Sequence, residues 1–318
     1  MLPQRVDAVN FIRAETDRYF DDLIARSGGV NRWHHTREPA PIDKQVVVRM
    51  NRDTLYSSAI LDVSQGATVS MPDASGRYQT AMVVDEDHYI DHVFDSPGEH
   101  RLEALMFPTS HVALAVRTLV DPADPADLAE VVTLQDQLRI DARSTNAPSH
   151  PPWDTDSLDG TRALLMKLAE GLNVFDGAFG SRSETDPILH LLGTAAGWGG
   201  LPSEQATYIG VSPNLPVGHH VLKVPGDVPV RGFWSVSVYN SDGYFEPNEA
   251  GRYSVNSVTA ARDRDGGVTI NLGGDASLPN AIPLPEGWNY TVRLYQPEPA
   301  ILDKTWSFPT LSDPDQAT

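Results

Sequence analysis

The apolar positions of this chain follow a helical period first, then an alternating one, and both periods recur once. Residues 6–27 hold apolar side chains largely on one stripe and end at two glycines, which predicts an amphipathic helix. Between residues 44 and 120, short apolar runs separated by Gly and Pro turns are typical of β-strands. The strands predicted there are 46–48, 59–63, 67–71, 78–84 and 111–116.

The middle of the chain predicts three further helices. Residues 128–140 and 157–179 carry apolar stripes, and Asp186-Pro187 predicts the start of a helix that ends near Gly197. The last third returns to alternation. Its predicted strands are 205–211, 220–224, 233–239, 252–257, 268–272 and 290–294.

These elements predict a mainly β protein with an α-helical spacer and an N-terminal helix. Strands at this spacing favour a β-sandwich or a partly closed barrel, and the length of 318 residues favours two domains. The predicted parts are an N-terminal helix and loop (1–43), a first β domain (44–122), a helical spacer (123–203), a second β domain (204–311) and a loose tail (312–318).

An internal echo links the two β regions. Residues 78–89 align without a gap on residues 233–244, with aromatic residues at both ends and Asp85 opposite Asn240. The echo predicts two β domains built alike, each with an aromatic-started strand that leads into an acidic turn. A cleft between two such domains would be the natural place for a ligand.

Composition narrows the classes of partner. Lys and Arg number 24 against 43 Asp and Glu, a formal net charge of -19, which argues against nucleic acid and anionic membrane surfaces. The chain has no cysteine, so disulfides and thiolate chemistry are excluded. The first residues lack the basic and apolar segments of a signal peptide, and no apolar run approaches the roughly 20 residues of a membrane span. We therefore expect a soluble, cytoplasmic protein without membrane contact.

The densest polar stretch is 49–58, where charges lie next to predicted strands. In a strand, Arg49 would share one face with Asp53, and Arg52 would share the other with Tyr56. A guanidinium there could hold a carboxylate or phosphate, with the tyrosine hydroxyl adding a further bond. The alternative is a buried Arg–Asp pair that fixes the register of the strand.

Arginine next to tyrosine recurs in the second β domain, at Arg252-Tyr253 and around Arg293. Such pairs suit sugar or aromatic ligands, although aromatic residues at strand ends also close hydrophobic cores. The candidate ligand-binding residues are Arg49, Asn51, Arg52, Asp53, Tyr56, Trp234, Tyr239, Arg252, Tyr253, Arg293 and Tyr295.

Other chemistry has less support in the sequence. Asp85, His88 and His92 are metal-type ligands, but they lie in a predicted turn and follow no known zinc or iron spacing. Neither a nucleophile elbow nor a Gly-rich phosphate loop is present. We predict no metal and no cofactor, and the catalytic candidate is Asp53 acting with a tyrosine as an acid–base pair.

Two groups of motifs resemble known families. The runs Met50-Asn-Arg-Asp-Thr-Leu-Tyr-Ser57 and Gly76-Arg-Tyr78 resemble the bacterial domain of unknown function numbered 1254. The runs Gly232-Phe-Trp-Ser-Val-Ser-Val-Tyr-Asn240 and Val292-Arg-Leu-Tyr295 resemble its usual companion, numbered 1214. The resemblance implies two β-sandwich, jelly-roll-like domains joined by helices, in a family without an established common activity. The chain departs from many relatives at Asn280, which is not followed by their tryptophan, so the resemblance does not imply a pocket-forming aromatic residue there.

Three functions stay open at this point. The first is binding of a small polar, acidic or sugar-like molecule in an Arg- and Tyr-lined cleft. The second is a cofactor-independent hydrolase, lyase or isomerase that uses Asp53. The third is a structural or self-associating module, a homo-oligomer with the first helix as its interface. A buried Asp53 with a shifted pKa beside an open pocket would favour catalysis, whereas a carboxylate clamped between arginines without a cavity would favour structure.

Overall fold

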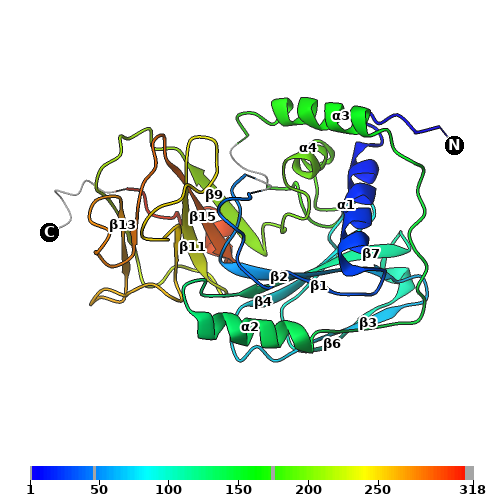
Figure 1. Ribbon diagram of the computed structural model, residues 1–318, viewed down its shortest axis with the longest axis horizontal. Coiled ribbons are helices and arrows are strands. Elements are labelled where there is room, and N and C mark those ends of the chain that lie inside the picture. The colour runs from blue at the N-terminus through cyan, green and yellow to red at the C-terminus, as the bar shows by residue number, and fades with distance from the viewer. Residues whose placement is uncertain (1, 46–47, 173–175, 312–318) are drawn as a thin grey trace. The chain divides into compact units, whose positions relative to one another are not determined.

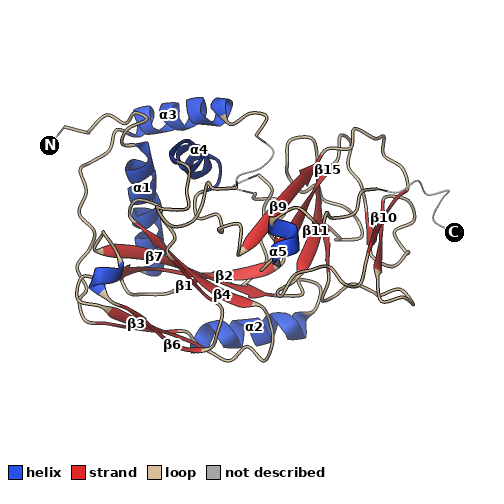
Figure 2. Cartoon of the chain, turned by 180° about the vertical axis from the view of Figure 1, so that it is seen from behind, coloured by secondary structure: helices blue, strands red, loops and turns tan. Residues whose placement is uncertain are grey.

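A computed structural model describes residues 2–45, 48–172 and 176–311. Its contacts divide the chain into two compact units (Figures 1 and 2). Unit 1 comprises Met1–Arg37, Leu55–Val120 and Asp124–Ser203, and unit 2 comprises Glu38–Thr54, Asp121–Ala123 and Glu204–Thr318. The chain is mainly β, as the sequence predicts. Residues 44–54, which the sequence analysis groups with the first β domain, belong to unit 2.

Unit 1 is a sandwich of two sheets with helices around it. Apolar side chains from both sheets form one buried cluster, for example Leu61, Val69, Val83 and Leu114. The strand order is β1-β2-β7-β4-β5 in one sheet and β6-β3-β8 in the other. The strands are β1 (His34–His35), β2 (Thr54–Asp62), β3 (Ala67–Met71), β4 (Gln79–Asp85), β5 (His92–Phe94), β6 (Gly98–Leu102), β7 (His111–Leu119) and β8 (Arg139–Ala142).

The helices of unit 1 lie on both sides of these sheets (Figure 1). Helices α1, α3 and α4 share one apolar cluster that contains Phe11, Leu165 and Leu192. Asp186 caps the first turn of α4, as the Asp-Pro pair predicts, and accepts hydrogen bonds from the N–H groups of two following residues. The helical segments are α1 (Phe11–Ser27), the short η1 (Ala104–Met106), α2 (Pro125–Gln137), α3 (Thr155–Leu168) and α4 (Pro187–Gly197).

Unit 2 is a second pair of sheets around its own core. Its strand orders are β12-β11-β15-β9 and β10-β13-β14, and a cluster that includes Leu222, Val236, Ile270 and Val292 joins them. The strands are β9 (Ala206–Val211), β10 (His220–Val224), β11 (Trp234–Tyr239), β12 (Ser254–Asn256), β13 (Val268–Leu272), β14 (Ala281–Ile282) and β15 (Asn289–Tyr295), followed by the short α5 (Pro299–Leu302).

The two units repeat one topology. The order β5-β4-β7-β2 of unit 1 recurs as β12-β11-β15-β9 in unit 2, and the antiparallel pair β3–β6 recurs as β10–β13. The strands also follow one another along the chain in the same sequence. The sequence similarity between residues 78–89 and 233–244 therefore reflects a structural repeat.

The register of the paired strands is also equivalent in the two units. Thr80 of β4 lies opposite Arg117 of β7, and Ser235 of β11 lies opposite Arg293 of β15. The gapless alignment places Thr80 on Ser235, so the two buried arginines occupy equivalent positions. Arg293 thus has a counterpart, Arg117, that the sequence analysis did not find.

Several predicted elements differ from the structure. The helix predicted over 128–140 ends at Gln137, and residues 139–140 belong to strand β8. Arg49 has a left-handed backbone (φ 54°) and Arg52 and Asp53 precede β2, so these residues are not in a strand. Of the predicted strand 46–48, Val48 is in a turn and the other two residues lie outside the described ranges. The helix predicted over 157–179 ends at Leu168, and positions 173–175 of it, like the tail 312–318, are also outside those ranges.

None of the described helices combines the length and the apolar character that crossing a bilayer requires.

Candidate functional site

The polar stretch before β2 packs on one face of the main sheet of unit 2. The N–H of Arg49 donates to the carbonyl of Gly243 (2.7 Å), and its guanidinium donates to the Thr291 hydroxyl (2.8 Å). The Asn51 amide donates to the Tyr295 hydroxyl (2.9 Å). The two side-chain bonds attach the loop before β2 to strand β15. The polar side chains of this loop therefore have hydrogen-bond partners although the loop is not in a strand.

Arg293 lies at the centre of this contact and is fully buried. Its guanidinium donates to the hydroxyls of Ser237 (3.0 Å) and Tyr239 (2.8 Å) and to the carbonyl of Arg49 (2.7 Å). Burial alone would lower the pKa of Arg293, but the neighbouring tyrosines and Asp53 raise it above its ordinary value. The arginine is therefore a permanent cation that holds the loop by its backbone.

Asp53 is 1% exposed and faces the same sheet. One carboxylate oxygen accepts a hydrogen bond from Ser235 (2.6 Å) and the other accepts one from Ser254 (3.4 Å). Burial raises the pKa of Asp53, and the charge of Arg293 and these hydroxyls lower it part of the way back. The charge that faces Asp53 thus comes from β15, which corrects the expected pairing with Arg49 along one strand.

Three aromatic candidates fill the core of unit 2. Trp234 packs edge-on against Phe308, Tyr239 packs on Phe245, and Tyr295 stacks on Phe233 with ring centroids 4.2 Å apart. All three are buried. Tyr56 belongs to unit 1, where Arg117 lies over its ring.

The remaining candidates, Arg52, Arg252 and Tyr253, meet at a pocket of about 430 Å³ in unit 2. Arg52 lies over the Tyr253 ring (5.6 Å to the centroid) and donates to the carbonyl of Ala40. Arg252 is exposed and donates to the carbonyl of Ala276 (3.0 Å). No carboxylate in the described part of the chain lies within ion-pair distance of either guanidinium.

Two residues of β12 separate the pocket from the carboxylate of Asp53. Ser254 and Asn256 of β12 line the pocket and also hydrogen-bond to Asp53, which itself contributes nothing to the wall. Asp121 also lines the pocket, so one acidic residue lies there together with the two arginines. The pocket therefore combines two cationic groups, one anionic group and several hydroxyl and amide groups.

The residues considered for a metal do not converge. His88 is fully buried; its Nε2 accepts from the N–H of Gly199 (2.8 Å) and its Nδ1 contacts the Thr194 hydroxyl (2.7 Å). Asp85 accepts hydrogen bonds from backbone N–H groups of its own turn, and His92 stacks with Phe94. Within the described ranges no three side chains of metal-binding type come together.

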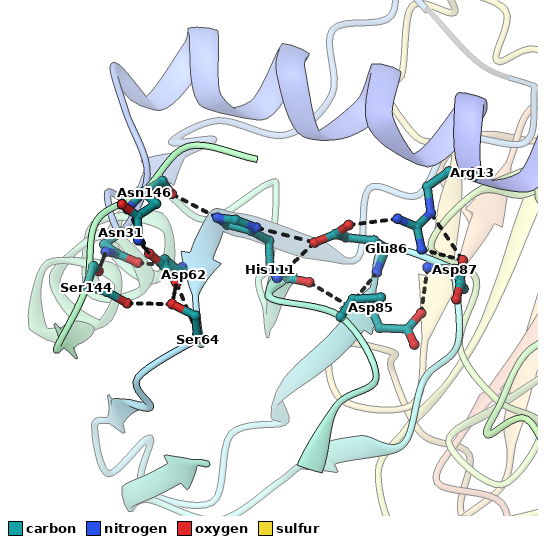
Figure 3. Close-up of polar contacts among 11 residues, drawn as sticks. Arg13, Asn31, Asp62, Ser64, Asp85, Glu86, Asp87, His111, Ser144 and Asn146 are labelled. Carbon is teal, nitrogen blue, oxygen red and sulfur yellow. Dashed lines mark hydrogen bonds and ion pairs between the residues drawn. The ribbon is translucent and has the colours of Figure 1, made fainter. Parts of the chain in front are cut away.

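A polar network that the sequence analysis missed crosses unit 1 (Figure 3). Arg13 of α1 donates to Glu86 (2.8 Å), Glu86 accepts from the backbone N–H of His111 (2.9 Å), and the His111 ring reaches the carbonyl of Asn146 (2.8 Å). Asn146 in turn donates its N–H to Asp62 (2.7 Å). The members come from five separate parts of the chain, so no local motif marks them.

Known proteins resemble the chain in sequence motifs and in fold, and the descriptions of two matching families and two similar structures name no activity. Residues 30–100 match the family model described as "Protein of unknown function (DUF1254)", and residues 216–299 match "Protein of unknown function (DUF1214)". A search of curated proteins found no match.

Two solved structures resemble the chain. The VPA0106 protein from Vibrio parahaemolyticus is 18% identical with a TM-score of 0.73, and the alignment covers 96% of this chain and 97% of that one. An uncharacterised protein from Burkholderia cenocepacia is 16% identical with a TM-score of 0.53, over 96% of this chain and 87% of that one. At these identities the likeness establishes the fold alone.

Proposed function

The chain joins an N-terminal DUF1254 domain to a C-terminal DUF1214 domain, and from this premise we propose that unit 2 binds a small organic anion in the pocket at Arg52 and Arg252. The observation that carries the proposal is that Arg52 and Arg252 line one pocket and that, among the described residues, no carboxylate lies within ion-pair distance of either guanidinium. The planar fork of arginine matches carboxylate and phosphate oxygens in two parallel hydrogen bonds.

Charge and size both support this kind of ligand. The whole chain has a net charge of -19, so a pocket with two cations and one acid stands out from its surroundings. A volume of about 430 Å³ lies within the roughly 300–1,000 Å³ of small-molecule sites. Tyr253, whose ring lies under Arg52, also lines the pocket, and Asp121 favours a ligand that carries hydroxyl groups besides its anionic group.

Binding is favoured over catalysis by the position of Asp53. Its raised pKa would suit a general base, but the carboxylate is 1% exposed and both of its oxygens already accept hydrogen bonds from serines. A ligand in the pocket would meet Ser254 and Asn256 before it met Asp53.

Titration calorimetry with matched ligands tests the proposal. Citrate, succinate, glucuronate and phosphate are compared with glucose and glycerol, at low and at moderate salt. We expect at least one anion to bind, with an affinity that falls as salt rises. Arg252→Ala is expected to weaken that binding about tenfold or more, the loss of one charge-assisted bond pair.

The control variant is Arg231→Ala, which removes an exposed arginine of unit 2 that does not line the pocket. Equal binding of glucose or glycerol, or equal weakening by both variants, would contradict the proposal. Consumption of a bound anion, followed by proton NMR and abolished in Asp53→Asn, would favour the enzymatic alternative instead.

A further inference from the structure

Helix α3 presents an apolar stripe to solvent. Leu164 is 64% exposed and Leu168 is 70% exposed, four residues apart and therefore on one face, while Leu158 and Leu165 are buried in unit 1. Large apolar side chains in such a row usually mark a surface that another molecule covers.

Gly160 belongs to the same stripe, one helical turn before Leu164. A glycine inside a helix weakens it, and usually a close neighbour explains its presence. Here a Cβ atom at Gly160 would meet nothing within 4 Å. The glycine thus leaves a notch in the stripe that none of the described residues fills.

We propose that α3 pairs with α3 of a second copy of this chain, in antiparallel orientation about a two-fold axis at Leu164. In that arrangement each Leu168 lies opposite the Gly160 notch of the other copy, because the two residues are equally far from Leu164. The interface is isologous, as in most homodimers.

Charge along α3 favours the antiparallel pairing of identical helices. Asp156 lies in its first turn and Lys167 lies in its last turn, while the two charged residues between them, Asp159 and Arg162, are paired with Arg18 and Glu15 of α1. Antiparallel packing brings the acidic end of each helix beside Lys167 of the other, while parallel packing would bring like charges together.

The sequence predicts the first helix as the interface of a self-associating module. Its large aromatic side chains Phe11 and Phe20 are buried inside unit 1. Leu164 and Leu168 of α3 are exposed and so remain available for a partner.

The first experiment is sedimentation equilibrium of the full chain over a range of concentrations. One pair of short helices buries less than the roughly 1,200 Å² of a stable interface, so we expect a reversible equilibrium between monomer and dimer. Leu164→Glu is expected to shift it to monomer. The matched control is Leu105→Glu, at a leucine that is 100% exposed in η1 of the same unit, which is expected to leave the dimer intact.

The second experiment uses the absence of cysteine in the natural chain. Leu164→Cys introduces a single thiol on the proposed two-fold axis, where the two Cβ atoms can reach disulfide distance. Under mild oxidation we expect a covalent dimer from this variant and far less from Leu105→Cys. Gly160→Leu, which fills the notch in a place where the monomer has room, is expected to weaken the dimer.

Several results would overturn the proposal. In sedimentation, these are a monomer at all concentrations or a dimer that Leu164→Glu and Gly160→Leu leave unaffected. In cross-linking, the contradicting result is an equal yield of covalent dimer from Leu164→Cys and Leu105→Cys. Binding of monomeric protein to phosphatidylcholine–phosphatidylserine vesicles that is lost in Leu164→Glu would assign the stripe to a membrane surface instead.

Discussion

Asp85 and Asn240 hold the same place in two copies of one turn. The Oδ1 atom of Asp85 accepts hydrogen bonds from the N–H groups of Asp87 (2.9 Å) and Tyr89 (2.8 Å). Asn240 accepts the corresponding bonds from the residues two and four positions later, at 3.1 and 3.0 Å. The same turn is thus built once around an acid and once around its neutral amide.

The first prediction concerns the charge of Asp85. Its second oxygen, Oδ2, is buried and has no hydrogen-bond partner in the described part of the chain, and burial raises the pKa of Asp85 to about 6. Because the folded-state pKa is raised, the protonated acid suits the fold. As the pH rises from about 4 to about 6, deprotonation of Asp85 progressively lowers the free energy of unfolding, and this loss is complete above about pH 6. A difference of two pKa units corresponds to roughly 3 kcal/mol.

Asp85→Asn is therefore expected to raise the free energy of unfolding at pH 8 by about 1–3 kcal/mol, since the unpaired amide offsets part of the gain. The difference from the natural chain should shrink towards pH 4. Urea unfolding at a series of pH values measures it. Asn240→Asp is the reciprocal control and should destabilise at pH 8. A constant difference at all pH values would contradict this account of Asp85.

The second prediction concerns Arg293, which holds the loop before β2. Arg293→Lys keeps the charge, but one ammonium group cannot reach Ser237, Tyr239 and the carbonyl of Arg49 together, so we expect a loss of about 2–4 kcal/mol of stability. Arg293→Met should cost more, about 3–5 kcal/mol, because Asp53 then lacks its countercharge.

A double variant separates the two causes of that loss. Asp53→Asn in the Arg293→Met background removes the stranded carboxylate and is expected to recover part of the stability. Free energies of unfolding for the four chains give the coupling. If the two substitutions are additive, Asp53 and Arg293 do not act as a charge pair.

Local patterns in the sequence predict much of this fold. The strands 67–71, 220–224 and 268–272 are predicted to the residue, because each is a short apolar run closed by turn residues. The Asp-Pro pair fixes the start of α4 for a similarly local reason, a cap and a compatible first residue.

The candidate site was harder to predict because its contacts are distant along the chain. The sequence pattern places the charged residues at 49–53 in a strand. Their partners are hydroxyl and carbonyl groups around Arg293, and the periodicity of the local sequence carries no information about such distant contacts. The edge strand β8 was missed because its four residues are half exposed and only one of them is large and apolar. The Glu86–His111 contact depends on the pairing of β4 with β7, which only the fold determines.

The third prediction concerns His111 in the network of Figure 3. Burial alone would lower the pKa of His111, but its bonds to Glu86 and to the carbonyl of Asn146 raise it. A raised histidine pKa stabilises the fold fully below the unfolded value of about 6.5, and this stabilisation is lost as pH rises through the folded value. The contribution is expected to be about 1–3 kcal/mol, as for a buried hydrogen bond to a charged group.

Two variants check this expectation. His111→Gln should lose stability at pH 5.5 and much less at pH 9. Glu86→Gln should lower the His111 pKa, read from the imidazole proton shifts in an NMR titration. An unchanged His111 titration in Glu86→Gln would show that the carboxylate does not stabilise the imidazolium.

The last prediction concerns two glycines beside Phe179. A Cβ atom at Gly200 would lie 2.5 Å from a ring carbon of Phe179, and one at Gly193 would lie 2.8 Å from the Cβ of Ala178. Gly200→Ala and Gly193→Ala should therefore each destabilise unit 1 by about 1–3 kcal/mol, even though alanine favours the helix at position 193. Gly197→Ala, where a Cβ meets nothing within 4 Å, is the matched control and should be neutral or slightly stabilising. Thermal unfolding of the three variants measures the difference, and equal effects would mean that these contacts relax without cost.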